Sequence, residues 1–254
     1  MDFDPKLMAT IGTSFITSLA AKGITGPAET INDLWKVSFG YPIHYFSEKR
    51  RIKYEINLQK FEKELTNKIL EIPKENVQEP KESIIGPALE ASKYCFDEEE
   101  IRELFANLIA SSMDSTYNEF IQHSFVEIIK QLSPYDAKLF SCFDFREPYI
   151  TRVYVDKNKM HHYEGYVDKL FIDDDFPDYY LNQISLENLI RLGLIKIEEG
   201  TSLNNTSLYE KYESLGNLCS ELKLVYGQYN CIKKYLEITA LGKVFKEVCI
   251  KDSL

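Results

Sequence analysis

The chain lacks the signatures of the common enzyme classes. It contains no P-loop, no glycine fingerprint for a dinucleotide and no nucleophile elbow, so we expect no catalytic or cofactor-binding residues. Its five cysteines are odd in number and include no CxxC pair, which predicts reduced thiols and no metal site. No basic segment precedes an apolar run near the N-terminus, so we expect no secretion signal and a cytoplasmic location.

Positive charge is also scarce. The 254 residues carry 30 Lys and Arg against 40 Asp and Glu, a formal net charge of -10. Broad affinity for nucleic acid or anionic lipid requires a net positive face, so this balance argues against both, although a local basic patch is compatible with it. A hydrophobic content of 44% suffices for a buried core, in one large domain or two ordinary ones.

Apolar residues at helical spacing predict a core helix over residues 97–113. Five of them share one face: Ile101, Leu104, Phe105, Leu108 and Ile109. Asn107, Ser111 and Ser112 lie away from the centre of this stripe. Asp97 is placed to cap the helix N-terminus.

Two further helices are expected after this one. The first places apolar residues on one side: Ile121, Phe125, Ile128, Ile129 and Leu132. The second starts at Ser133-Pro134-Tyr135-Asp136, with serine as the cap, proline in the first turn and an acid three residues after the cap.

Three blocks of this region carry a family resemblance. Residues 86–91 (GPALEA), 98–113 (EEEIRELFANLIASSM) and 123–134 (HSFVEIIKQLSP) resemble the signature blocks of the Abi-alpha (abortive infection alpha) family, and the resemblance extends over roughly residues 27–250. It implies bacterial anti-phage defence, in which an infected cell stops growing or dies before phage are released, in response to a phage-derived trigger. It implies no catalytic residues. His123, at a family position, is the histidine most worth following.

The N-terminal segment 5–21 combines a helical apolar stripe with many small residues. The stripe consists of Met8, Ile11, Phe15 and Leu19, and Gly23, Gly26 and Pro27 are expected to end the helix. Its apolar span of about fifteen residues is shorter than the roughly twenty that cross a bilayer. We therefore expect it to dock on the rest of the chain, on a protein partner or on a second copy; a membrane-active helix is the alternative.

A long charged helix is expected over residues 48–70. Its apolar seam is Tyr54, Leu58, Phe61 and Leu65. Arg50, Arg51 and Lys53 could hold phosphate or lipid headgroups, but a solvated helix with ion pairs such as Glu64 with Lys68 is the simpler interpretation. Residues 82–120 are acidic and could dock against this basic helix.

The C-terminal half mixes strands and helices. Strands are expected at residues 149–155, 163–172, 194–198 and 235–238, with helices at 181–192, at 209–218 and after Thr239. This order resembles a winged-helix domain with an enlarged wing. The fold class is therefore mainly α (α+β), with a helical domain at 1–119 and a winged-helix-like domain with a small antiparallel sheet at 120–254.

DNA binding by this half is not favoured. The exposed positions expected on the 181–192 helix are Asn182, Gln183, Ser185, Glu187, Asn188 and Arg191. Arg191 is the one cation among them, and Asp173 to Asp175 lie upstream, so a duplex would find a poor anchor. His161 and His162 are adjacent on an expected strand and point to opposite faces, so they do not suit one metal.

We therefore expect an abortive-infection protein that acts by macromolecular contact. A membrane-directed effector and a winged-helix nucleic-acid-binding regulator are the alternatives.

Overall fold

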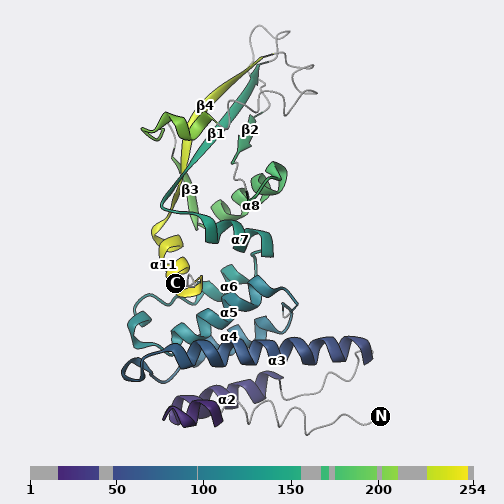
Figure 1. Ribbon diagram of the computed structural model, residues 1–254, viewed down its shortest axis with the longest axis vertical. Coiled ribbons are helices and arrows are strands. Elements are labelled where there is room, and N and C mark those ends of the chain that lie inside the picture. The colour runs from purple at the N-terminus through teal and green to yellow at the C-terminus, as the bar shows by residue number, and fades with distance from the viewer. Residues whose placement is uncertain are drawn as a thin grey trace. The chain divides into compact units, whose positions relative to one another are not determined.

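The computed structural model describes residues 17–39, 48–95, 97–155, 167–171, 175–198, 202–210 and 228–250. The fold is mainly helical with a small antiparallel sheet, as predicted (Figure 1). The chain divides into two compact units: Met1–Ala137 together with Val244–Leu254, and Lys138–Lys243. The helix after residue 123 packs with helices of the first unit.

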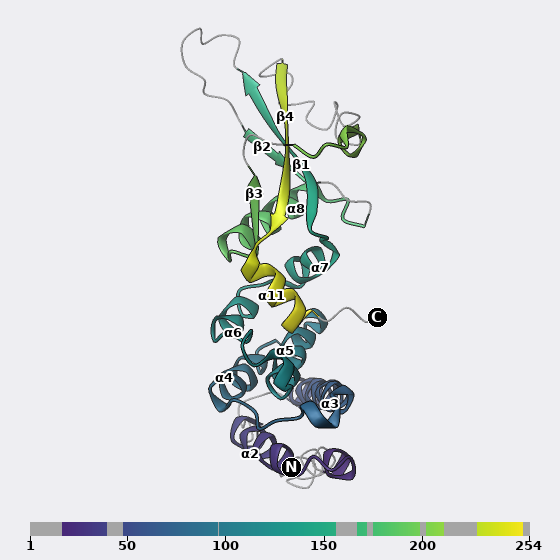
Figure 2. The same ribbon diagram turned by 90° about the vertical axis from the view of Figure 1, so that its left-hand side faces the viewer.

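Unit 1 is built around one central helix. Its helices are α2 (Gly26–Phe39), α3 (Glu48–Glu71), α4 (Glu82–Ser92), α5 (Glu99–Ser112) and α6 (Ser124–Ile129). Helix α5 contacts α3, α4 and α6, and α4 also contacts α2 and α6. Both views show α5 between α3 and α6 (Figures 1 and 2).

The predicted core helix is confirmed, with a wider buried face than its sequence indicated. The five apolar residues of the stripe are each at most 4% exposed. Asn107, Ser111 and Ser112 are buried as well, because α5 is covered on several sides rather than on one. The expected cap is wrong: Glu98 occupies the N-cap position without a side-chain cap, and Asp97 accepts a hydrogen bond from Lys53 instead.

The next predicted helix start is correct. The backbone N–H of Ser133 donates to Asp136 Oδ2 at 2.8 Å, and the N–H of Asp136 donates to Ser133 Oγ at 3.1 Å. This reciprocal capping box begins α7 (Pro134–Cys142). Before it, α6 and its flanks bury the apolar residues that were predicted to share one side.

Helix α2 was not expected. The sequence pattern predicts that Gly26 and Pro27 end the N-terminal helix, whereas they begin α2. The described part of the N-terminal helix covers residues 17–21, and Gly23, with φ +80°, forms the turn that follows. Met8, Ile11 and Phe15 lie outside the described residues. Trp35 of α2 stacks on Phe61 of α3 with ring centroids 5.6 Å apart.

Unit 2 contains a four-stranded antiparallel sheet in the order β2-β1-β4-β3. Its strands are β1 (Arg146–Val155), β2 (Val167–Leu170), β3 (Ile195–Glu198) and β4 (Gln228–Ile238). Residue Ile150 pairs with Leu170 of β2 and with Lys233 of β4. Each strand matches a predicted one, although β4 begins seven residues earlier than expected. The winged-helix resemblance stays a prediction.

Helix α8 (Tyr179–Arg191) contacts β2 and β3. Asn182 ties the first turn to the preceding loop, since its Nδ2 donates to the carbonyls of Phe171 and Phe176 at 3.1 and 2.7 Å. Gly193, with φ +74°, ends it as predicted. After β4, Thr239 Oγ1 accepts from the N–H of Gly242 at 2.9 Å, which confirms the predicted cap of α11 (Ala240–Cys249).

Within the described part of the chain, none of the helices is long and apolar enough to cross a membrane. Outside that part lie His161, His162, Asp173, Asp174 and, beyond Glu210, the helix expected at 209–218. A short 3-10 helix, η3 (Thr206–Tyr209), ends at the residue where that helix is expected to begin.

Candidate interaction site

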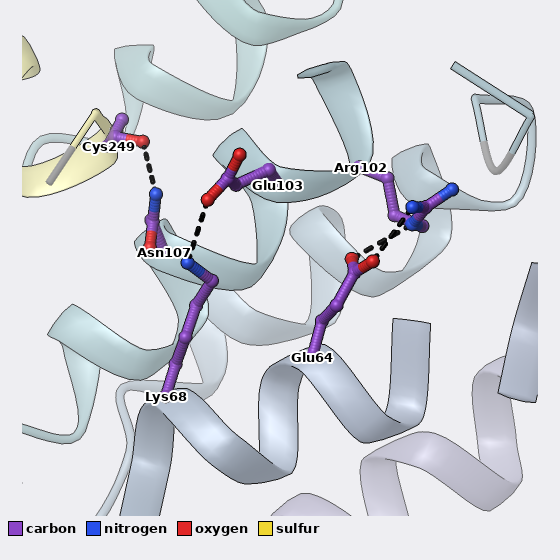
Figure 3. Close-up of polar contacts among 6 residues, drawn as sticks. All are labelled: Glu64, Lys68, Arg102, Glu103, Asn107 and Cys249. Carbon is purple, nitrogen blue, oxygen red and sulfur yellow. Dashed lines mark hydrogen bonds and ion pairs between the residues drawn. The ribbon is translucent and has the colours of Figure 1, made fainter. Parts of the chain in front are cut away.

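Ion pairs join α3 to α5 in unit 1 (Figure 3). The guanidinium of Arg102 donates to both carboxylate oxygens of Glu64, at 2.9 and 2.7 Å. Lys68 donates to Glu103 at 3.1 Å. The expected pairing of Glu64 with Lys68 along α3 is therefore wrong, because each has an opposite charge facing it on α5. The hydrogen bonds to Glu64 raise the pKa of Arg102, while its burial lowers it less.

The basic side of α3 also meets the acidic region that follows it. Lys53 Nζ lies 2.8 Å from Asp97 Oδ2. This hydrogen bond lowers the pKa of Asp97. The structure thus contains the predicted neutralisation of the basic helix by residues 82–120, through Lys53 and Lys68, alongside the opposite pairing of Arg102 with Glu64.

The C-terminal turn of α11 is fastened to α5 by two buried polar side chains. Asn107 Nδ2 donates to the carbonyl of Cys249, and Ser111 Oγ donates to the carbonyl of Val248, both at 2.9 Å (Figure 3 shows the first). Carbonyls in the last turn of a helix have no partner within the helix, so these donors act as its cap. The Oδ1 atom of Asn107 is buried and makes no hydrogen bond.

The exposed face of α8 is apolar over its first half. The side chains of Tyr180, Leu181 and Ile184 are 57%, 44% and 64% exposed, while Leu186 and Leu189 on the opposite side are at most 2% exposed. A contiguous exposed apolar face on a helix is typical of an interaction site. We call Tyr180, Leu181 and Ile184 the α8 face.

Sequence reasoning missed the α8 face. It placed Asn182 and Ser185 on the exposed side, whereas they are 0% and 3% exposed. Asn182 is buried because its amide satisfies two loop carbonyls. The available signal was helical spacing, because Tyr180, Leu181 and Ile184 lie within one turn of each other.

A second exposed face runs along α3. Ile52 and Ile56 are each 49% exposed, and Lys60 and Lys63 are exposed further along the helix. The acids of this stretch lie elsewhere: Glu62 is buried, and Glu55 and Glu64 are half-buried. Between residues 52 and 67, the exposed side of α3 therefore carries lysine and isoleucine side chains but no acid. We call Ile52, Ile56, Lys60 and Lys63 the α3 face.

The residues predicted to take part in interactions lie on separate elements. Leu19 is fully buried. Arg50 and Arg51 belong to α3, but the structure does not describe their side chains. His123 is exposed, with Nε2 3.1 Å from Ser83 Oγ. Arg191 is exposed and donates to Asn188 Oδ1 at 2.6 Å. Among the described residues, no group of His, Cys, Asp and Glu is placed to hold a metal ion.

The chain matches a protein-family model. The model of the family described as abortive infection alpha matches residues 53–249, so the chain belongs to that family. The match begins within α3 and ends with the last residue of α11, and it therefore includes the α8 face. Membership suggests a role in abortive-infection defence. No curated protein and no solved structure matches the chain.

Proposed function

We propose that this protein defends bacteria against phage by abortive infection and that it acts through contact of the α8 face with another macromolecule. The family membership supports the defence role. The exposure of Tyr180, Leu181 and Ile184 supports the contact, because leaving three neighbouring apolar side chains in water costs free energy that a partner would recover. This exposure is the observation that carries the proposal.

The two alternative mechanisms predict different events in the infected cell. A membrane-directed effector using residues 5–21 would collapse the membrane potential. A nucleic-acid-binding regulator would use α8 against DNA, but that helix presents Arg191 together with the exposed acid Glu187. One arginine beside an acid is a weak electrostatic anchor for a duplex.

The test compares infected cells that carry wild-type protein, a Leu181→Asp/Ile184→Asp variant or the matched control Val37→Asp. Val37 is an apolar residue of α2 that is 70% exposed, outside the α8 face. We expect wild type and control to protect a culture at low phage dose and to stop growth at high dose. The α8 variant should accumulate normally and lose both effects.

Protection retained by the α8 variant would contradict the contact through α8. Loss of membrane potential in step with growth arrest would favour the membrane alternative, and cleaved or protein-bound DNA would favour the regulator.

A further inference from the structure

The α8 face has acidic residues at both ends of its apolar strip. Tyr180 and Ile184 lie one helical turn apart, with Leu181 beside them. Asp178, at the N-cap, and Glu187, in the next turn, are both exposed. A partner for this face therefore needs an apolar strip of similar length with basic residues next to it.

The α3 face of the same chain has these properties. Ile52 and Ile56 also lie one turn apart, and Lys60 and Lys63 follow on the solvent side. Between residues 52 and 67 the exposed positions of α3 include no Asp or Glu. Neither Lys60 nor Lys63 forms an ion pair with another described residue, so both are available to a partner.

We propose that the α8 face of one copy docks antiparallel on the α3 face of a second copy. Both apolar strips span four residues, about 6 Å along a helix axis. Ile52 would lie opposite Ile184, and Ile56 opposite Tyr180. The lysine end of the α3 face then meets Asp178. Apolar contact supplies the attraction, and the opposite charges fix the direction.

This contact joins two different surfaces, which determines the kind of assembly. Each docked pair retains a free α3 face and a free α8 face, so copies add head to tail into an open chain or a closed ring. One helix against another buries a small area, and the association should be weak, on the order of micromolar. The proposal rests on the proposed function, because it identifies the partner of the α8 face.

The experiment uses purified full-length protein in analytical ultracentrifugation. Wild type should show a mass that rises with concentration beyond that of two chains. Ile184→Asp destroys the α8 face and Ile56→Asp the α3 face, so each variant alone should remain a monomer. An equimolar mixture should form a complex of one copy of each, because each variant retains the face that the other lacks. Val37→Asp is the control and should associate as wild type does. Circular dichroism checks that all variants are folded.

A monomeric wild type at every concentration overturns the proposal, as does a mixture that stays monomeric. A double variant, Ile56→Asp/Ile184→Asp, that keeps the mass of associated wild type also overturns it. So does a cross-link in the Ile56→Cys/Ile184→Cys variant that forms within one chain. Protection from phage is scored separately. Loss of protection in Ile184→Asp without any change in self-association overturns the homotypic contact and leaves the proposed function standing. If the mixture of the two variants associates and each variant alone still protects fully from phage, the contact between copies is supported and the proposed function is overturned.

Discussion

Removing Glu64 should destabilise unit 1 far more than removing its partner Arg102. The side chain of Arg102 is 5% exposed, whereas that of Glu64 is 31% exposed. Glu64→Ala therefore leaves a buried guanidinium without the carboxylate that accepts two of its hydrogen bonds. Breaking a buried pair from one side costs more than breaking an exposed one, and the partial exposure of Glu64 places the expected loss at about 2 to 3 kcal/mol. Arg102→Met leaves an acid that water reaches, for a loss of about 1 kcal/mol or less.

The sole tryptophan of the chain reports on this unit. Trp35 is 5% exposed and stacks on Phe61 of α3, so its fluorescence during urea unfolding follows unit 1. Adding Arg102→Met to Glu64→Ala should restore part of the lost stability, because the buried charge that lost its carboxylate partner is then gone. Lys60→Ala is the control, with an expected change within about 0.5 kcal/mol. A Glu64→Ala variant as stable as that control, or less damaged than Arg102→Met, would refute this reasoning.

Three further changes probe the core, the backbone and an ionisable group. Leu108→Ala should cost about 2 to 5 kcal/mol in the same urea assay, since its side chain is fully buried; an unchanged midpoint would contradict the position of α5. Gly242→Ala should prevent unit 2 from folding normally, because the new Cβ would lie 2.0 Å from the carbonyl oxygen of Leu194. Gly86→Ala on α4 meets nothing within 4 Å and should stabilise the protein by about 0.5 to 1 kcal/mol. Equal melting temperatures of the two variants by circular dichroism would contradict this. Burial first, and then the charge of Glu90, raises the pKa of Tyr54 from 10.0 to about 12. The stabilisation that Tyr54 gives the folded state is therefore complete below pH 10 and is lost as the pH rises toward 12. Tyr54→Phe should make the free energy of unfolding fall less steeply over this pH range, and a pH profile identical to that of wild type would contradict the shift.

Features set by local interactions could be predicted from the sequence. The capping box at Ser133 and Asp136 involves residues three apart, and Thr239 caps α11 through Gly242. The apolar stripe of α5 follows from helical spacing alone. The long helix at 48–70 differs from α3 by one residue. Each of these caps and helices depends on residues that are close in the sequence, so the spacing of residue types predicts it directly.

Features set by distant partners could not be predicted. Glu64 binds Arg102, 38 residues away, in preference to a lysine one turn along its own helix. Asn107 is buried because the end of α11, 142 residues later, supplies a carbonyl for its amide. Glycine and proline, here Gly26 and Pro27, end helices in some contexts and begin them in others, so the sequence pattern alone did not predict α2.

The candidate site shows the same limit. A polar residue such as Asn182 looks solvent-exposed until its two carbonyl acceptors are placed beside it. Once Asn182 and Ser185 turn inward, helical geometry requires Tyr180 and Ile184 to face the solvent. The α8 face therefore follows from the register of one helix, and that register is decided by packing rather than by the polarity of its residues.

The number of phage released per infected cell tests the central claim most directly. A one-step growth experiment should compare cells that make wild type, Ile184→Asp or Val37→Asp at matched protein levels. The account predicts few or no released phage with wild type and Val37→Asp, and release equal to that of unprotected cells with Ile184→Asp. Equal suppression of release by all three proteins would contradict a defence that depends on the α8 face.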